Sequence, residues 1–147
     1  MNITIEDAIK EKVEELFSMS SKNMGHALGF EYELLSRDEM RARMPVNENT
    51  IQPFGILHGG ASVALAETLA SVGAYLNIED PDKVAVGLEI NANHIRSVKM
   101  GNEVVGIAKP IHRGAQTQVW EIRIETDSGK LVSISRCTLA IVKRRAK

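Results

Sequence analysis

The sequence has few of the residues that would tie a chain to a specialised environment. Its 147 residues include one cysteine, Cys137, and four prolines, and aromatic residues make up 4% of the chain. A single cysteine excludes a disulfide within the chain and a cysteine-rich metal site. It also favours a reducing compartment, and the start of the chain lacks the basic and apolar segments of a secretory signal. We therefore expect a cytoplasmic protein.

An excess of charge of either sign is also lacking. Lys and Arg total 18 and Asp and Glu total 19, for a formal net charge of −1. This balance gives no reason to expect a nucleic acid or an anionic membrane as partner. The four histidines have no ligand spacing, so we expect no metal site. Residues 59–78 are too weakly apolar for a membrane span, and a helix buried inside one ordinary domain explains them better.

Hydrophobic periodicity predicts two helices. Apolar residues at helical spacing predict an N-terminal helix over residues 5–18, capped by Thr4 with Asp7 three residues later. A longer helix is predicted over residues 59–77. It is built of small residues and is apolar nearly all round, so we expect protein to surround it. Before the long helix, we expect short strands at 29–35 and 39–44 and loops at 20–30 and 45–53.

After the long helix the hydrophobic pattern changes from the helical period to the alternation of strands. Alternating patterns run through residues 84–91, 120–125 and 137–142, and residues 103–111 are a fourth strand candidate. The segment TDSGK at 126–130 predicts a hairpin turn. Mostly antiparallel strands with one central helix indicate an α+β fold. A single curved sheet wrapped around that helix accounts for both patterns.

One charged residue, Glu67, falls in the middle of this apolar helix. A carboxylate kept away from water is costly unless it is paired or solvated. Two interpretations remain open at this point. The carboxylate could belong to an ion pair or reach solvent at the edge of the sheet. Alternatively it could be a general base or nucleophile in a cleft.

The neighbours of Glu67 favour the catalytic interpretation. Gly59 begins the helix, where unpaired backbone N–H groups and the positive end of the helix dipole suit a developing oxyanion. Gln52 and His58 precede it and could add donors. Ser71 lies four residues after Glu67 on the same helical face and could orient water. This set of groups suits acyl transfer by hydrolysis.

The spacing of these groups raises a geometric difficulty. Glu67 lies eight residues after Gly59, about 12 Å along a helix that rises 1.5 Å per residue. The two residues cannot easily act on the same carbonyl within one chain. A symmetric dimer in which the helix start of one subunit faces Glu67 of the other would remove the difficulty, and we expect that arrangement.

Four segments together resemble the hotdog-fold acyl-CoA thioesterases, most closely the subgroup that acts on aromatic acyl-CoAs. They are QPFGILHGGASVALAETLASVGAYL, NANHIRSVKMG, PIHRGAQTQVWEI and GKLVSISRCTLAI. The resemblance covers roughly residues 28–143 and implies one hotdog domain over 1–147, with the N-terminal helix outside the matched core. It further implies homodimers or homotetramers, as dimers of dimers, with active sites at the dimer interface.

The resemblance also implies catalytic roles. Glu67 matches the family's catalytic carboxylate, as nucleophile or as base for water. Gly59 matches the residue whose N–H polarises the thioester carbonyl. Gln52 and His58 match supporting donors near the thioester, and Ser71 matches the hydroxyl that positions water or the intermediate.

Three residues match substrate contacts in the family. His94 matches a residue beside the acyl group, although it could also be a polar loop histidine. Arg96 is expected near the CoA phosphates, with Arg113 as a weaker candidate. CoA is the leaving half of the substrate, and no cofactor is implied.

The implied reaction is hydrolysis of an aromatic acyl-CoA to the free acid and CoA. The leading substrate is 1,4-dihydroxy-2-naphthoyl-CoA of menaquinone biosynthesis. Aliphatic, phenylacetyl and carrier-protein thioesters remain open. Two other classes are a hotdog dehydratase and a non-catalytic acyl-CoA-binding domain. The helix-entry sequence PFGILHGG argues against the first class, and the presence of Glu67 argues against the second.

Overall fold

Seven strands and one long helix form most of the structure, a computed structural model that describes residues 3–20 and 22–144. The strands form one sheet in the order β1-β2-β3-β5-β6-β7-β4. Neighbouring strands are antiparallel, except that β1 runs parallel to β2. The strands are β1 (Thr4–Ile5), β2 (Glu31–Leu35), β3 (Met40–Pro45), β4 (Lys83–His94), β5 (Glu103–Arg113), β6 (Thr117–Thr126) and β7 (Leu131–Lys143). The helices are η1 (Asp7–Ile9), α1 (Lys10–Ser18), α2 (Met24–Leu28) and α3 (Gly59–Leu76).

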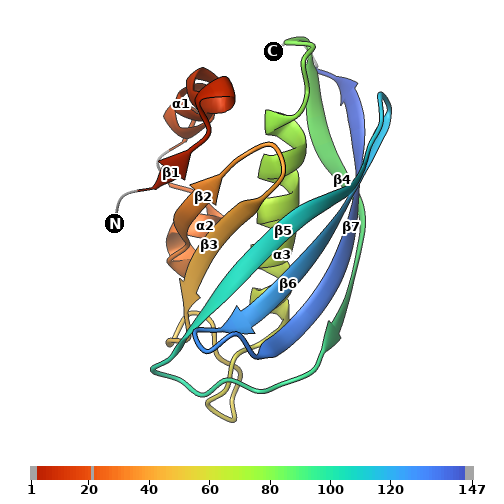
Figure 1. Cartoon of the computed structure of the whole chain (residues 1–147). Coiled ribbons are helices and arrows are strands. Elements are labelled where there is room, and N and C mark those ends of the chain that lie inside the picture. The colour runs from red at the N-terminus through yellow and green to blue at the C-terminus, as the bar shows by residue number, and fades with distance from the viewer. Residues whose placement is uncertain (1–2, 21, 145–147) are drawn as a thin grey trace.

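The sheet curves around α3, which lies along its concave face (Figure 1). Five strands, β3 to β7, contact the helix. The short helices α1 and α2 lie beside β2, away from β4 (Figure 1). This architecture confirms the predicted α+β class and the predicted sheet wrapped around one long helix. The helix was predicted over residues 59–77 and ends one residue earlier.

The predicted start of the N-terminal helix is wrong. Thr4 does not cap a helix, because Thr4 and Ile5 form strand β1 and pair with the last two residues of β2. The Glu6 backbone N–H then donates to the Leu35 carbonyl at 3.0 Å. Only after a single 3₁₀ turn does α1 begin, at Lys10. The free edge of β2 offers these residues backbone partners that local helical spacing cannot reveal.

The loop predicted over residues 20–30 contains the short helix α2. Asn23 caps it by accepting a hydrogen bond from the His26 backbone N–H at 3.1 Å. Gly29 ends the helix with φ of 75°, a left-handed conformation that glycine adopts without strain. Five residues are too few to display an apolar period, so only the caps could have indicated this helix.

The core lies between α3 and the sheet. Leu65, Leu69 and Trp120 are completely buried there. The Trp120 indole lies so close to the helix that a Cβ on Gly73 would stand 2.6 Å from the ring. The indole N–H donates to the Gln118 side chain at 3.0 Å, and Gln118 donates in turn to the Ala74 carbonyl at 3.3 Å. Helix and sheet are therefore joined by both apolar and polar contacts.

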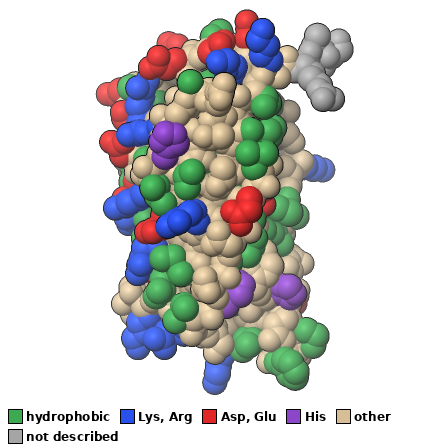
Figure 2. All heavy atoms as spheres, turned by 90° about the vertical axis from the view of Figure 1, so that its right-hand side faces the viewer, with side chains coloured by type: hydrophobic (Ala, Val, Ile, Leu, Met, Phe, Trp, Pro, Cys, Tyr) green, Lys and Arg blue, Asp and Glu red, His purple; other side chains and the backbone are tan. Residues whose placement is uncertain are grey.

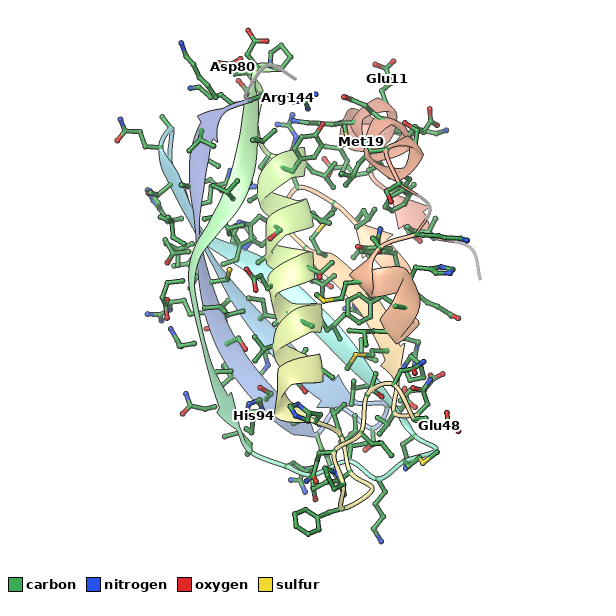
Figure 3. The ribbon with its side chains drawn as sticks, turned by 180° about the vertical axis from the view of Figure 1, so that it is seen from behind. Glu11, Met19, Glu48, Asp80, His94 and Arg144 are labelled. Atoms are coloured by element: carbon green, nitrogen blue, oxygen red, sulfur yellow. The ribbon has the colours of Figure 1, made fainter. Side chains whose placement is uncertain are left out.

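The other face of α3 is not surrounded in the single chain, contrary to the expectation for a helix so evenly apolar. Ala64, Ser71 and Tyr75 are half-buried, and Glu67 is exposed. Seen from behind, no helix or strand crosses in front of α3, which lies between β4 on one side and α1 and α2 on the other (Figure 3). The chain therefore leaves one long face of its central helix uncovered.

We predict that Gly73→Ala lowers the free energy of unfolding by about 1–3 kcal/mol, because the new methyl group would overlap the Trp120 ring. Helix propensity alone would give the opposite sign, since alanine favours helices over glycine by about 1 kcal/mol. Urea unfolding measures the change. In a Trp120→Phe background the cost should fall, and an equal cost in both backgrounds would contradict the steric explanation.

Candidate active site

The first turn of α3 offers an unoccupied backbone donor. The His58 ring caps the helix, because its Nδ1 accepts a hydrogen bond from the Gly60 N–H at 2.8 Å. Among the hydrogen bonds of the described residues, none uses the N–H of Gly59. Since Nδ1 is an acceptor, the neutral ring carries its proton on Nε2 and can donate from there. The helix start thus combines a free backbone N–H with a side-chain donor.

His94 lies over Gly59. A Cβ on Gly59 would stand 2.7 Å from Nε2 of His94, so a larger residue there would require the exposed His94 ring to shift. His94 ends β4 and its ring lies beside the N-terminal end of α3 (Figure 3). Gly59, His94 and Arg96 line one pocket of about 300 Å³ together with Ser62. Three of the predicted site residues, from α3, β4 and the loop after β4, are therefore brought together.

Gln52 lies in a tight loop that leads into α3. Its side-chain oxygen accepts a hydrogen bond from the Phe54 backbone N–H at 2.8 Å, and its backbone N–H donates to the Ile56 carbonyl at 2.9 Å. A bond from the His58 N–H to the Thr50 carbonyl holds the end of this loop at the helix start. The loop is thus fixed by its own hydrogen bonds, with the amide oxygen of Gln52 engaged and its amide nitrogen still able to donate.

Glu67 is exposed in the single chain. Its side chain leans on the backbone of β4, and a Cβ on Gly87 would stand 2.6 Å from Oε1. Glu67 also lies near Cys137 of β7. Burial raises the pKa of the Cys137 thiol to about 11, and the charges of Glu67 and Glu89 add to the shift. The thiol therefore stays protonated and is a poor nucleophile.

The predicted residues fall into two groups within one chain. Gly59, His58 and His94 lie at the start of α3, whereas Glu67 lies about 12 Å further along the helix. Ser71 follows one turn later, and it lines a different pocket from Gly59. The expected separation of the oxyanion donor from the carboxylate is thus present. That the donor of one subunit meets the carboxylate of the other across a dimer interface stays a prediction.

Arg113 lies away from both groups. Its guanidinium donates to the Arg37 carbonyl at 3.0 Å and to the Asn77 side chain at 3.1 Å, and it pairs with Asp38 at 2.9 Å. Asn77 is the C-cap of α3, so Arg113 is at the end of the helix opposite Gly59. The structure thus gives Arg113 a local structural role in this chain and does not bring it to the predicted site.

Two residues that contribute to these groups were not predicted. Ser62 is 2% exposed and lines the pocket of Gly59 and His94. Its position three residues after Gly59, on a neighbouring part of the helix surface, was the available signal. Gly87 has no side chain, so the Glu67 carboxylate can lie against the backbone of β4. An isolated glycine inside an alternating strand indicates a close approach, and this signal could have identified it.

The described part of the chain contains no group of three or more His, Cys, Asp or Glu residues that could hold a metal ion. Among its helices, none is long and apolar enough to cross a membrane.

We predict that His58→Ala lowers the free energy of unfolding by about 1 kcal/mol, because the Gly60 N–H loses its cap. His58→Asn should retain most of the stability, since asparagine is a good N-cap. Thermal and urea unfolding of the three proteins measure the difference. Equal losses in both variants would show that capping is not what the ring contributes.

Known proteins resemble this chain along most of its length. The 1,4-dihydroxy-2-naphthoyl-CoA hydrolase of Escherichia coli is 49% identical over 133 residues, which are 90% of this chain and 96% of that protein. The proofreading thioesterase of Cronobacter turicensis is 45% identical over 130 residues, 88% of this chain and 93% of its own. A crystal structure of a thioesterase from Haemophilus influenzae superposes with a TM-score of 0.79 at 44% identity, covering 90% of each chain.

The family model of the thioesterase superfamily matches residues 54–133. This range contains the start of α3, Glu67, His94 and Arg96, so the match falls on the candidate site as well as on the fold. The chain belongs to the thioesterase superfamily and is a thioester hydrolase with the hotdog fold.

Proposed function

We propose that this protein hydrolyses an aromatic acyl-CoA to the free acid and CoA, and that 1,4-dihydroxy-2-naphthoyl-CoA is its leading substrate. The observation that carries the proposal is the free N–H of Gly59 at the start of a helix whose next charged residue is Glu67. The names of two relatives that are 49% and 48% identical favour an aromatic acyl group, because both are 1,4-dihydroxy-2-naphthoyl-CoA hydrolases.

The carbonyl oxygen of the thioester accepts a hydrogen bond from the Gly59 N–H. This donor and the positive end of the α3 dipole stabilise the negative charge that develops on the oxygen. The Nε2 of His58 and the amide nitrogen of Gln52 are the supporting donors. His94, whose ring covers Gly59, contacts the acyl group next to the carbonyl.

Glu67 supplies the reacting carboxylate in one of two ways. It attacks the carbonyl carbon and forms an anhydride that water then hydrolyses, or it takes a proton from the water that attacks. In both cases the carbon–sulfur bond breaks and CoA leaves as the thiolate, which takes up a proton. Ser71 orients the water, and Arg96, which lines the pocket of Gly59 and His94, binds the CoA phosphates.

We further propose a homodimer, or a homotetramer of two such dimers, with β4 at the dimer contact. β4 is a twelve-residue edge strand, and Val86 and Leu88 on it are 44% and 61% exposed. A long apolar edge invites pairing with a second copy. In Figure 2, charged side chains gather mostly at one side and the top of this face, and hydrophobic side chains lie around the acidic and basic side chains near its middle.

Pairing about a two-fold axis at β4 would also cover the exposed face of α3. The two α3 helices would then run in opposite directions, so that Gly59 of one subunit approaches Glu67 of the other. In this geometry the two groups that act together come from different subunits, so the separation of about 12 Å between Gly59 and Glu67 of one helix no longer keeps them apart. A cytoplasmic location fits a CoA substrate and the free Cys137.

We predict that Glu67→Gln keeps the fold but lowers turnover at least about 100-fold, because the amide neither attacks nor accepts a proton. Thiol release is measured on 1,4-dihydroxy-2-naphthoyl-CoA, benzoyl-CoA, phenylacetyl-CoA and hexanoyl-CoA. Glu14→Gln, which neutralises an exposed carboxylate on α1, is the matched control. Near-normal turnover by Glu67→Gln would rule out the assigned role, and preference for another acyl group would change the substrate only.

A second prediction concerns sharing of the site between subunits. The Glu67→Gln and His58→Ala proteins should each be nearly inactive. When the two proteins are mixed and exchange subunits, about a quarter of the wild-type number of active sites should be restored. One site of each mixed dimer would combine the intact Glu67 with the intact His58. Turnover is measured after exchange has been verified with differently tagged subunits. Exchange without recovery would mean that each site is built by one chain.

A further inference from the structure

Phe54 is the most exposed large apolar side chain of the described residues, with 89% of its surface accessible. Its ring has no part in the mechanism above. It is also not isolated, because Ile95 and Met100 are exposed at the same end of the molecule, where the Met100 N–H donates to the Gly55 carbonyl at 3.1 Å. A group of exposed apolar side chains beside a catalytic site indicates a contact with another molecule.

The loop that carries Phe54 is held by its own hydrogen bonds. The Phe54 backbone N–H donates to the Gln52 side chain at 2.8 Å, and the Gly55 N–H donates to the Gln52 carbonyl at 2.9 Å. Gly55 has a φ of 74°, which a glycine adopts without strain. The ring is therefore presented to solvent by a defined turn, and Gln52, one of the supporting donors of the site, builds that turn.

This loop lies at the end of β4. Ile56, which follows the turn, lines the same pocket as Gly59, His94 and Arg96. Ile56 also pairs with Lys99 in the segment after β4. β4 ends at His94 and is the strand proposed above as the dimer contact. The turn with Phe54 is therefore next to one end of that contact.

Antiparallel pairing of β4 with a second copy determines what this end meets. With the two-fold axis at the middle of the strand, His94 of one subunit lies beside Lys83 of the other. Ala85, two residues after Lys83, lines a groove on α3 together with Ser71 and Tyr75. The groove has a volume of about 610 Å³, enough for a phenyl ring beside an acyl group.

The direction of the helices gives the same result independently of the strand. In the proposed dimer the two α3 helices are antiparallel, and Gly59 of one subunit approaches Glu67 of the other. Residues that precede Gly59 in one subunit then lie alongside residues that follow Glu67 in its partner. Phe54 precedes Gly59, and Ser71 follows Glu67 by one turn. Phe54 of one subunit thus reaches the part of the site beyond the partner's Glu67.

We propose that Phe54 of each subunit enters the groove on the partner's α3 and is a specificity-determining residue of the partner's site, where its ring forms a wall against the acyl group. The proposal rests on the proposed thioesterase function and its shared site. It gives the exposed ring an apolar partner in the dimer. An aromatic acyl group gains a ring–ring contact with Phe54 that an aliphatic chain does not make.

Kinetics of Phe54→Ala test the contact with the acyl group. The variant should lower kcat/KM for benzoyl-CoA about 10-fold or more, because the ring loses an apolar wall. The value for hexanoyl-CoA should fall less, since no ring–ring contact is lost. Phe54→Leu keeps an apolar side chain and should lose less than Phe54→Ala. Ile111→Ala is the matched control, because it removes an exposed apolar side chain of β5 and should leave both substrates unaffected.

Subunit exchange tests whether Phe54 acts in the partner's site. Phe54→Ala and Glu67→Gln subunits are mixed, and exchange is verified with differently tagged chains. One site of each mixed dimer then combines the intact Phe54 of one chain with the intact Glu67 of the other. About a quarter of the wild-type number of sites should therefore be restored, above the sum of the two separate proteins.

The outcomes separate this proposal from the thioesterase function itself. Recovery in the mixture of Glu67→Gln with His58→Ala, but none in the mixture with Phe54→Ala, would place Phe54 in the site of its own chain and overturn the proposal. An unchanged kcat/KM for Phe54→Ala would overturn it as well, and in both cases the thioesterase function stands. No thiol release from either substrate by the unaltered protein would overturn both.

Discussion

The close approach of α3 to the sheet is the constraint on which the rest of the structure depends. At three of the contacts between helix and sheet, a side chain of one element approaches a glycine of the other. Gly73 admits the Trp120 ring, Gly106 admits Leu65 and Leu69, and Gly87 admits the Glu67 carboxylate. A methyl group at any of these positions would stand 2.6 to 2.7 Å from its neighbour. Dense packing around Gly73 and Gly106 cannot absorb such overlaps, so these two glycines set the depth of the helix, whereas the exposed Glu67 side chain can move away from Gly87.

That depth determines which chemical groups the helix presents along its length. At its start, Gly59 leaves room for the His94 ring and keeps a free backbone N–H, while His58 satisfies the next donor. Two turns later, Glu67 is exposed on the face that no described helix or strand covers. A helix is straight and its rise is fixed, so one chain presents the two groups but cannot bring them together.

The distribution of charge over the sheet separates a solvated face from an edge suited to contact. On β3 and its neighbours, Arg43 makes ion pairs with Glu33, Glu103 and Asp127, and the carboxylates of Asp127 and Glu33 raise the pKa of Arg43. Exposed pairs of this kind add little stability, but they keep the surface hydrated. The edge strand β4 instead exposes Val86 and Leu88. The same strand borders both Glu67 and a groove that Ser71, Tyr75 and Ala85 line, so a partner at β4 would lie next to both.

Much of the architecture follows from the sequence, since alternation and helical spacing report which faces are buried. They identified α3 to within one residue, the strands around it and the α+β class. The same local logic failed at the N-terminus, where Thr4 and Ile5 join the sheet because β2 has a free edge. It also missed α2, which is too short to show a period and depends on Asn23 and Gly29.

The sequence by itself determined the residue types of the candidate site and their spacing on one helix, because both are properties of neighbouring positions along the chain. Only the tertiary structure decided which of these residues meet. It brought His94 onto Gly59, moved Arg113 to the opposite end of α3, and left Glu67 in the open. It also formed a groove from α1, α3, β4 and Arg144, which no local pattern connects. Contacts between distant segments depend on how the sheet curves around the helix, and that curvature is a property of the whole fold.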